Sequence, residues 1–460
     1  FDTASVTECT QLFCPSYSSA LSTDPFSEEQ EYYLQVGLNS NIAAEDFARK
    51  DLNLVVVLDI SGSMRSSFNT YYYDQFRESE SEDPDAGKSK MEIATKAITQ
   101  MLDHLGPNDK FGMVLFDSSD FIGKPLSEVS KTDMNAIKGH ILDLQPRGGT
   151  NFEAGYKGGT SLFRELSGTE IENAENRIIF LTDAMANMGS LSEDSLLGLT
   201  KANAEEKIHT TFIGIGVDFQ TQLIEEITKV KGANYYSVHS SEEFKKRLDT
   251  EFSYMVTPLV FNLQLQFESD GFEIEKVYGS PESEEATGEI MKVNTLFPSP
   301  TVDGETKGGI VILKLNKTGD NNEIRLKTSY ETRDGVMEEN TKKFIFTNTN
   351  ADYYGNTGIQ KGILLSRYVN IMRDWIEVER KNVPPPSGSY VVYYEENGIP
   401  IAKETDIEFS RWERQSARLA VSEDYETIIS DFSDYFEQQS AIIGDSTLAQ
   451  EATLMEQILS

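Results

Sequence analysis

Short apolar runs alternate with segments of helical periodicity through the first half of the chain. The run 54–58, Leu-Val-Val-Val-Leu, predicts a strand that is buried on both faces. A capping-box sequence, Ser89-Lys90-Met91-Glu92, then begins a helix. Strands that alternate with helices predict an α/β fold with a doubly wound, mostly parallel sheet. The further strands are predicted at 111–116, 177–182, 210–216 and 234–238, and the further helices at 132–144, 221–231 and 242–254.

The pattern changes at Thr257, where segments of period two replace the helical ones. Alternating segments follow at 261–267, 310–315, 323–326 and 343–346, with turn residues between them. This pattern is typical of an antiparallel β-sandwich. Because these strands are few for a complete sandwich, we expect the separate strand 32–38 to join them. The α/β domain is therefore expected to be inserted in the sandwich or followed by it.

Helices return from about residue 352. One apolar stripe runs from Ile359 to Trp375, and the clearest amphipathic stripe of the chain runs from Tyr425 to Phe436. Between them, Asn397-Gly398 predicts a hairpin turn. The predicted organisation is a loosely ordered lead-in over 1–30, a strand segment of the sandwich over 31–50, the α/β domain over 51–256, the β-sandwich over 257–350 and a mainly helical region over 351–460.

Three oxygen-bearing side chains follow the first buried strand at alternate positions. They are Asp59, Ser61 and Ser63, and Gly62 between the serines allows a sharp turn. Carboxylate and hydroxyl oxygens suit Mg²⁺ or Ca²⁺ rather than zinc or a softer metal. Open α/β sheets also bind their ligands at the carboxyl ends of their strands. The segment therefore predicts a divalent-cation site at this edge of the sheet.

The segment 54–64 resembles the first strand and metal loop of a von Willebrand factor type A domain, whose Asp-x-Ser-x-Ser pattern these three residues match. Two later motifs stand in the family's order: Thr150 in Gly-Gly-Thr-Asn and Asp183 in Phe-Leu-Thr-Asp. The resemblance implies a metal-ion-dependent adhesion site for one Mg²⁺ or Ca²⁺. Its ligands would be Asp59, Ser61, Ser63, Thr150 and Asp183. Neutral hydroxyl ligands would leave the metal able to bind a carboxylate of a partner.

The segment 66–87 separates the metal loop from its helix and departs from the compact family pattern. It holds Tyr71, Tyr72 and Tyr73, followed by six acidic residues and a single arginine. The ordinary explanation is a solvated insertion. The alternatives are a contact surface formed by the tyrosines, a second cation site or a lid over the metal. The candidate partner contacts are Tyr71, Tyr72, Tyr73 and Asn151. Asp117 and Asp218 also follow predicted strands; a place on the same edge as the metal ligands is the alternative, and ordinary loop positions are favoured.

Composition narrows the possible partners and compartment. The 460 residues include 76 Asp and Glu against 41 Lys and Arg, and the net charge of −35 argues against nucleic acid or an anionic membrane as partner. No apolar run reaches the ~18–20 residues that would span a bilayer. Cys9 and Cys14 are close enough in sequence for a small disulfide loop. With the sequon at Asn316 and a first residue other than Met, they favour a secreted or cell-surface protein.

No catalytic set emerges from the sequence, so we expect a protein that is not an enzyme. The four histidines are scattered, and Gly87-Lys88-Ser89 lacks the earlier glycine of a phosphate-binding loop. The leading hypothesis is an extracellular protein that binds an acidic group of a protein or matrix partner through its metal. The alternatives are an acidic matrix protein with a stabilising metal site and a non-catalytic subunit of a metal-dependent complex. The order of the domains is similar to that of secreted or surface von Willebrand A proteins of two kinds, the bacterial calcium-activated-channel-like proteins and the inter-alpha-inhibitor heavy-chain-like proteins.

Overall fold

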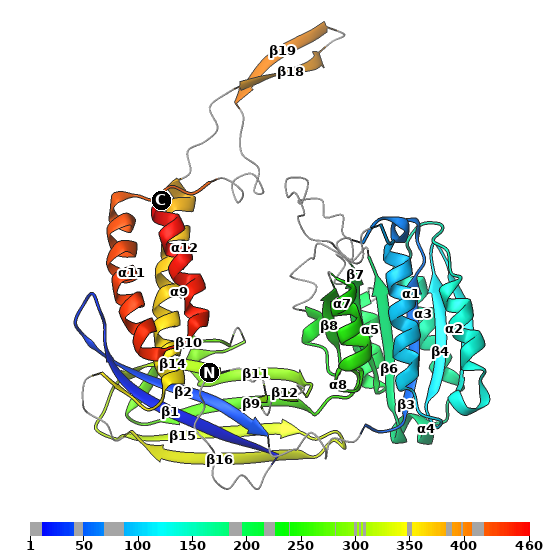
Figure 1. The fold of residues 1–460 in the computed structure, drawn as a ribbon, viewed down its shortest axis with the longest axis horizontal. Coiled ribbons are helices and arrows are strands. Elements are labelled where there is room, and N and C mark those ends of the chain that lie inside the picture. The colour runs from blue at the N-terminus through cyan, green and yellow to red at the C-terminus, as the bar shows by residue number, and fades with distance from the viewer. Residues whose placement is uncertain are drawn as a thin grey trace.

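The computed structural model has an α/β domain on one side and a β-sandwich with a helical bundle on the other (Figure 1). The residues that it describes are 12–40, 49–68, 87–183, 196–215, 226–238, 240–280, 282–298, 301–302, 305–306, 310–346, 352–382, 389–396, 399–406 and 418–460.

The α/β domain is built on a six-stranded sheet in the order β5-β4-β3-β6-β7-β8. All neighbouring pairs are parallel except the antiparallel edge pair β4–β5, so the predicted mostly parallel sheet is confirmed. Strand β3 lies at its centre, with all eight residues buried. The strands are β3 (Leu52–Asp59), β4 (Lys110–Phe116), β5 (Asp120–Glu128), β6 (Glu175–Thr182), β7 (Ile208–Ile215) and β8 (Asn234–Val238).

Helices cover both faces of this sheet. The alternation of side chains along β3 sends Leu54, Val56 and Leu58 into one core and Val55 and Val57 into the other. The first core is closed by α1 (Lys90–Met101), α2 (Met134–Leu142), α7 (Ser241–Lys245), the π-helical η8 (Lys246–Thr250) and α8 (Phe252–Val256). The second is closed by α3 (Phe152–Ser161), α4 (Gly168–Asn173) and α5 (Leu196–Glu205).

The β-sandwich is formed by a five-stranded sheet, β10-β14-β2-β1-β17, and a four-stranded sheet, β11-β9-β15-β16. Apolar residues from both sheets meet in one core, including Val36 of β2 and Leu326 of β15. Two strands of the sandwich precede the α/β domain and the rest follow it, so the domain is inserted between β2 and β9 (Figure 1). The bounds are β1 (Phe13–Thr23), β2 (Gln30–Ser40), β9 (Val260–Ser269), β10 (Phe272–Tyr278), β11 (Glu289–Leu296), β14 (Ile310–Lys317), β15 (Glu323–Glu331), β16 (Met337–Ile345) and β17 (Tyr353–Tyr354).

Strand β1 corrects the expectation of a loosely ordered lead-in over residues 1–30. It pairs with β2 in an unbroken antiparallel register from Phe13↔Ser40 to Thr23↔Gln30. The expectation was wrong for 13–23 because serines stand at buried positions of this strand, which hides its apolar alternation. Ser22, for example, is fully buried and its Oγ lies 2.8 Å from the hydroxyl oxygen of Tyr354 in β17. Backbone pairing on both sides holds this polar strand in place.

The C-terminal region is a bundle of α9 (Thr357–Asn382), α11 (Glu423–Ile443) and α12 (Ala449–Leu459). Arg367 of α9 joins the bundle to the sandwich, because it donates to Glu31 Oε2 at 2.7 Å and to the Tyr435 hydroxyl at 2.8 Å. None of the described helices is both long and apolar enough to span a membrane. The remaining elements are the pair β12 (Thr301–Val302) and β13 (Glu305–Thr306), and the pair β18 (Ser389–Glu396) and β19 (Ile399–Asp406).

The sandwich contacts the α/β domain at the edge where its parallel strands begin. Lys50, just before β3, pairs with Asp334 at 3.0 Å, and Lys231, just before β8, pairs with Glu331 at 2.7 Å. Both carboxylates belong to the sandwich, at the end of β15 and in the turn that follows it. The docking therefore uses the amino-terminal ends of the strands and leaves their carboxyl ends to form the site described below.

Two glycine-to-alanine substitutions test how closely α3 packs on the sheet. An added Cβ at Gly155 would lie 2.5 Å from Cγ of Phe116, whereas an added Cβ at the exposed Gly139 in α2 meets nothing within 4 Å. Overpacking should make Gly155→Ala less stable by about 1–3 kcal/mol. Gly139→Ala should gain about 0.5–1 kcal/mol from its better helix propensity. Urea unfolding measures both, and equal effects of the two substitutions would contradict the close packing of α3.

Candidate metal centre

The carboxyl ends of three adjacent parallel strands bring three aspartates to one edge of the sheet. Asp59 ends β3, Asp117 follows β4 and Asp183 follows β6. The strands β4 and β6 flank β3 in parallel register, so the chain leaves all three strands at neighbouring points. This edge is the one at which the sequence predicts a cation site.

Asp59 is buried at the point where β3 ends and the metal loop begins. Its Oδ1 accepts a hydrogen bond of 2.7 Å from the backbone N–H of Ser61, and its Oδ2 accepts one of 2.6 Å from Oγ1 of Thr182. The carboxylate therefore fixes the turn of its own loop and ties that loop to the end of β6. Beyond Ser61 the chain forms one 3₁₀ turn, η2 (Gly62–Arg65).

A continuous chain of oxygen atoms leads from this loop to Asp183. Ser61 Oγ lies 3.0 Å from Ser63 Oγ, and Ser63 Oγ donates to Asp183 Oδ1 at 2.8 Å. The other oxygen of Asp183, Oδ2, accepts from Lys90 Nζ at 2.9 Å. The structure therefore brings together four of the five predicted ligands, Asp59, Ser61, Ser63 and Asp183, and adds a lysine that the prediction did not include.

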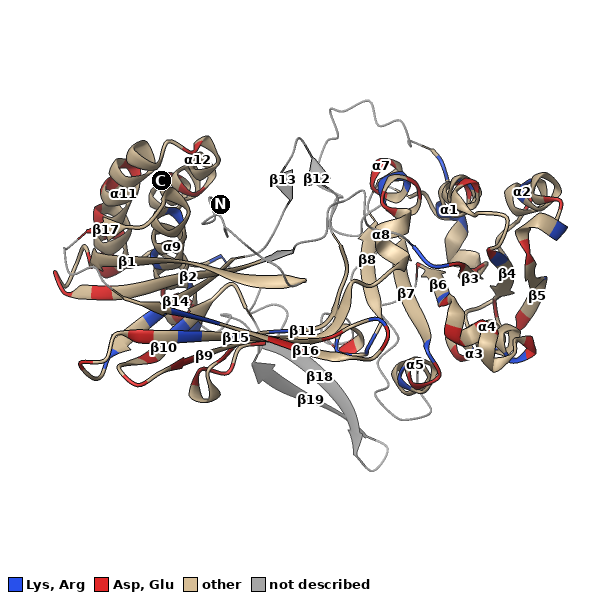
Figure 2. Ribbon diagram, turned by 90° about the horizontal axis from the view of Figure 1, so that it is seen from below, with Lys and Arg blue, Asp and Glu red and all other residues tan. Residues whose placement is uncertain are grey.

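Burial shapes the electrostatics of the site. It raises the pKa of the Asp59 carboxyl above its usual value, and the negative charge of Asp183 acts in the same direction. Hydrogen bonds from Ser61 and Thr182 oppose these effects. Elsewhere, acidic residues are spread over both parts of the molecule (Figure 2). Because the carboxylates of Asp59 and Asp183 share a buried setting, added positive charge beside them is favourable.

The loop that carries Thr150 is docked on the metal loop through its backbone. Gly148 O accepts from Gly62 N at 3.1 Å, and Ile60 O accepts from Arg147 N at 2.6 Å. Gly148 has φ of +72°, a conformation that favours glycine. Thr150 is exposed, and no hydrogen bond recorded for the described residues joins its side chain to the other four ligands. The structure thus places Thr150 on an adjacent loop that is docked on the metal loop through its backbone.

Asn151 and Asp117 have structural partners on this rim. The Asn151 side chain caps α3 by accepting from the N–H of Ala154 at 3.1 Å. Asp117 is buried and accepts from Ser119 N at 3.0 Å and from Arg147 Nε at 3.1 Å. These contacts account for Asp117 as an ordered loop residue, as expected from the sequence. The role of Asn151 as a partner contact stays a prediction.

The two ends of the segment 66–87 are held together beside the metal loop. Ser67 and Ser89 form an antiparallel bridge, Phe68 N donates to Lys88 O at 3.1 Å, and Lys90 N donates to Ser66 O at 3.0 Å. The segment therefore leaves and rejoins the domain next to the candidate site.

Several predicted residues lie outside the described residues, and their roles stay predictions: Cys9, Tyr71, Tyr72, Tyr73, Asp218 and the turn 397–398. Cys14, the predicted partner of Cys9, lies buried in β1.

The donor set fits a hard divalent cation. It consists of two carboxylates and two or three neutral hydroxyls, the oxygen ligands that Mg²⁺ and Ca²⁺ prefer. In the described part of the chain, no three His, Cys, Asp or Glu side chains form a cluster that could hold a metal ion, so the hydroxyls of the serines would have to complete this set. The shared burial of Asp59 and Asp183 supplies the negative charge that such an ion would neutralise.

Two residues of this site, Thr182 and Lys90, were not among the predicted ligands. Thr182 lies in the motif that ends in Asp183, and its position in β6 beside the last residues of β3 allows the hydrogen bond to Asp59. Lys90 lies in the capping box that begins α1. A lysine at the first position of a helix is unfavourable beside the positive end of the helix dipole, and this was the signal that could have found it.

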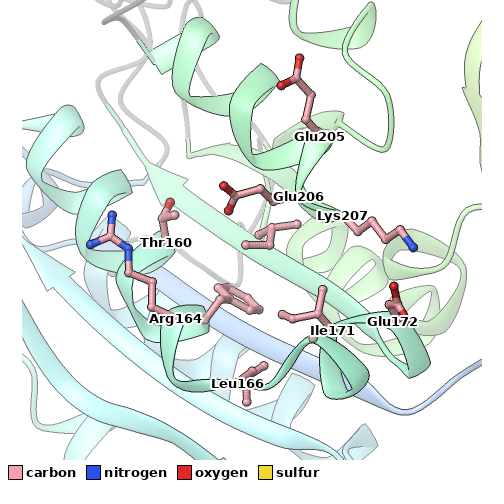
Figure 3. A pocket seen from close by; sticks show the side chains of 11 residues that line it. Thr160, Arg164, Leu166, Ile171, Glu172, Glu205, Glu206 and Lys207 are labelled. Carbon is pink, nitrogen blue, oxygen red and sulfur yellow. The ribbon is translucent and has the colours of Figure 1, made fainter.

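A separate cavity of about 370 Å³ lies at the opposite edge of the α/β domain (Figure 3). Apolar residues such as Ile171 and Ile208, the first residue of β7, contribute to its walls. Charged residues of both signs, Arg164, Glu206 and Lys207, also line it. Because this edge carries the beginnings of the strands, the cavity is distinct from the candidate metal centre.

Residues 54–186 match the family model described as von Willebrand factor type A domain. Inter-alpha-trypsin inhibitor heavy chain H2 of Mesocricetus auratus is 22% identical over 218 residues, which cover 47% of this chain and 21% of that protein. Heavy chain H4 of Bos taurus is 24% identical over 228 residues, with 48% and 22% coverage. The chain therefore spans only about a fifth of the length of these relatives.

A solved structure of similar extent is a von Willebrand factor type A protein from Catenulispora acidiphila. It is 12% identical, has a TM-score of 0.46, and the match covers 78% of this chain and 80% of that chain. The ArnB paralog VWA2 from Sulfolobus acidocaldarius matches over 96% of this chain and 93% of its own at 11% identity, with a TM-score of 0.40. At these TM-scores the two likenesses support no further conclusion.

Removing the charge of Asp59 tests its electrostatic setting. The raised pKa means that the folded protein binds this proton more tightly than the unfolded chain, so stability is lost as the pH rises through the folded pKa. In chelator at pH 7, Asp59→Asn should therefore be more stable than wild type. The difference should close as the pH falls towards about 4, the ordinary pKa of aspartate.

Asp109→Asn is the matched control for this measurement. Asp109 is also buried, but its carboxylate pairs with Arg49 at 2.6 Å and accepts from Leu52 N at 2.8 Å. Loss of that charge leaves the arginine without its partner and should cost about 3 kcal/mol at pH 7. Denaturant unfolding in chelator compares the three proteins. A metal-free Asp59→Asn protein less stable than wild type at pH 7 would contradict this account of Asp59.

Proposed function

We propose that this chain, which carries a von Willebrand factor type A domain over residues 54–186, is a protein-binding module that uses one divalent cation to bind a carboxylate of its partner. The observation that carries the proposal is the chain of oxygens from Ser61 through Ser63 to Asp183, set beside the buried Asp59. The partner would be a protein or matrix component with an exposed acidic group.

Each ligand has a chemical reason to be present. Asp59 and Asp183 would supply the negative charge that holds Mg²⁺ or Ca²⁺, and Ser61 and Ser63 would supply neutral oxygens. Thr150, on the exposed loop docked against the metal loop, would add a third hydroxyl. Hydroxyl ligands leave most of the positive charge of the cation uncancelled. A carboxylate from outside then becomes a favourable further ligand.

Binding rather than catalysis is proposed because the described residues of the site offer no free general base for hydrolysis. Asp59 and Asp183 are committed to the hydrogen bonds described above, and no histidine is among their recorded partners in the described residues. We propose a location outside the cell on the basis of the sequon at Asn316, which lies exposed at the end of β14, and the predicted Cys9–Cys14 disulfide.

Metal binding is tested by titrating the full chain with MgCl₂, CaCl₂ and MnCl₂. Wild type should bind one ion, and at a hundred times the Kd its unfolding free energy should rise by about 2.7 kcal/mol. Asp59→Ala should lose this gain because it removes a charged ligand. Asp143→Ala removes the same charge from an exposed position at the end of α2 and should keep it. Calorimetry and thermal unfolding give the two readouts.

Carboxylate recognition is tested with two immobilised peptide pools that differ only in Asp or Asn at a central position. Wild type should be retained by the Asp pool in the presence of metal and released by chelator, whereas Asp59→Ala should not be retained. Many weak calcium sites with no retention would favour the acidic matrix protein instead. Retention that survives both chelation and the Asp59→Ala substitution would contradict a bridging metal.

A further inference from the structure

Lys90 occupies an electrostatically unfavourable position for a lysine. It is the first residue of α1, where the positive end of the helix dipole repels a cation. Its ammonium instead meets Asp183 Oδ2 at 2.9 Å, and the two side chains are only 13% and 1% exposed. A buried ion pair on a predicted metal ligand therefore offsets the unfavourable helix position.

The backbone around Lys90 fixes this pair in place. Ser89 caps the helix by accepting from Glu92 N, and the Glu92 side chain accepts from Ser89 N, which completes a capping box. Lys90 N also donates to Ser66 O at 3.0 Å, directly after the metal loop. The backbone N–H and the side-chain ammonium of Lys90 are therefore both bound to elements that carry the candidate site, which distinguishes it from a mobile surface lysine.

We propose that Lys90 is a built-in counter-cation of the metal centre, which competes with the divalent ion for Asp183 and makes firm metal binding depend on an anionic partner. This inference rests on the proposed function and assigns a role to a residue outside the ligand set. Asp183 offers two oxygens, and Ser63 and Lys90 each hold one of them. A metal that recruits Asp183 must therefore do so against an ammonium already paired with it.

The charge count gives the consequence for the partner. Asp59, Asp183 and Lys90 together carry −1, so a bound divalent ion leaves the site at +1. Without Lys90 the loaded site would be neutral. This count includes only the charged groups that take part in the hydrogen bonds and ion pair described above; nearby, Arg147 pairs with Asp117 at 3.1 Å. A net positive site holds its metal less firmly but attracts a carboxylate more strongly.

Metal and carboxylate should therefore strengthen each other's binding, and by linkage each must do so by the same factor. In chelator the lysine keeps Asp183 paired, so the metal-free domain avoids a second buried carboxylate without a cation beside it. Lys90 thus stabilises the empty site and favours occupation by metal and partner together.

Substitution of Lys90 tests the competition. Calorimetry of the full chain with MgCl₂ and CaCl₂ should show that Lys90→Gln, which keeps a hydrogen-bond donor without the charge, binds metal at least tenfold more tightly than wild type. Lys90→Arg should stay close to wild type because it keeps the charge. Lys96→Gln makes the same charge change at an exposed position of α1 and should leave the affinity unchanged.

Coupling to the partner is measured with the Asp and Asn peptides. The Asp peptide should raise the metal affinity of wild type severalfold, and this gain should shrink in Lys90→Gln. The Asn peptide should give no gain in either protein. A Lys90→Gln affinity equal to or weaker than that of Lys96→Gln would overturn the competition, while equal coupling in both proteins would overturn the link to the partner.

A measurement on wild type alone keeps the inference testable if Lys90→Gln does not fold. Metal should free the Lys90 ammonium from Asp183, so its acetylation by a small reagent, followed by mass spectrometry, should speed up relative to Lys96 when MgCl₂ is added. Unchanged labelling at a saturating metal concentration would overturn the competition. If Asp59→Ala loses metal binding but Lys90→Gln binds metal as wild type does, only this inference is overturned. If neither wild type nor Lys90→Gln binds metal, both proposals are overturned.

Discussion

A carboxylate without exposed surface, Asp59, ends the central strand of the α/β domain, and the surrounding loops are arranged to satisfy its two oxygens. One oxygen fixes the turn that places Ser61, and the other is bound by Thr182 at the end of the neighbouring strand. An unpaired buried carboxylate would be costly, so the two strand ends are held to each other. Asp183, the next residue after Thr182, is thereby brought to the same point. The candidate metal centre depends on this link.

Among the described residues, the sandwich does not dock at that edge. The sandwich docks where the parallel strands begin, through pairs such as Lys231 with Glu331, and so supports the domain from the opposite end. The segment 66–87 leaves and rejoins the domain beside the metal loop through the Ser67–Ser89 bridge.

Much of this could be predicted from the sequence, because buried parallel strands and helices have strong periodic patterns. The strand of Leu54 and the helix begun by Ser89 are in this class, and so is the edge to which Asp59 and Asp183 belong. The edge strand β5 was missed because most of its residues are exposed and do not alternate. Strand β1 was missed because serines take its buried positions.

Spatial relations between loops were beyond the sequence. The family pattern places Thr150 in the ligand set, but its side-chain position depends on how its loop docks, and that docking is made by the backbone of Gly62 and Gly148. The pairing of Lys90 with Asp183 joins positions 93 residues apart, and no local pattern encodes it. Residues that act through long-range contacts are therefore the ones for which a structure is needed.

The net charge of −35 makes a local positive centre more significant than it would be in a neutral protein. An acidic partner is repelled by the molecule as a whole, but charges farther away than about 8 Å are screened at physiological ionic strength. At close range the partner would meet the candidate ligands first, where Lys90 and a divalent ion would together outweigh Asp59 and Asp183. The lysine would then serve recognition as well as stability, because it would make the loaded site positive on an otherwise negative protein.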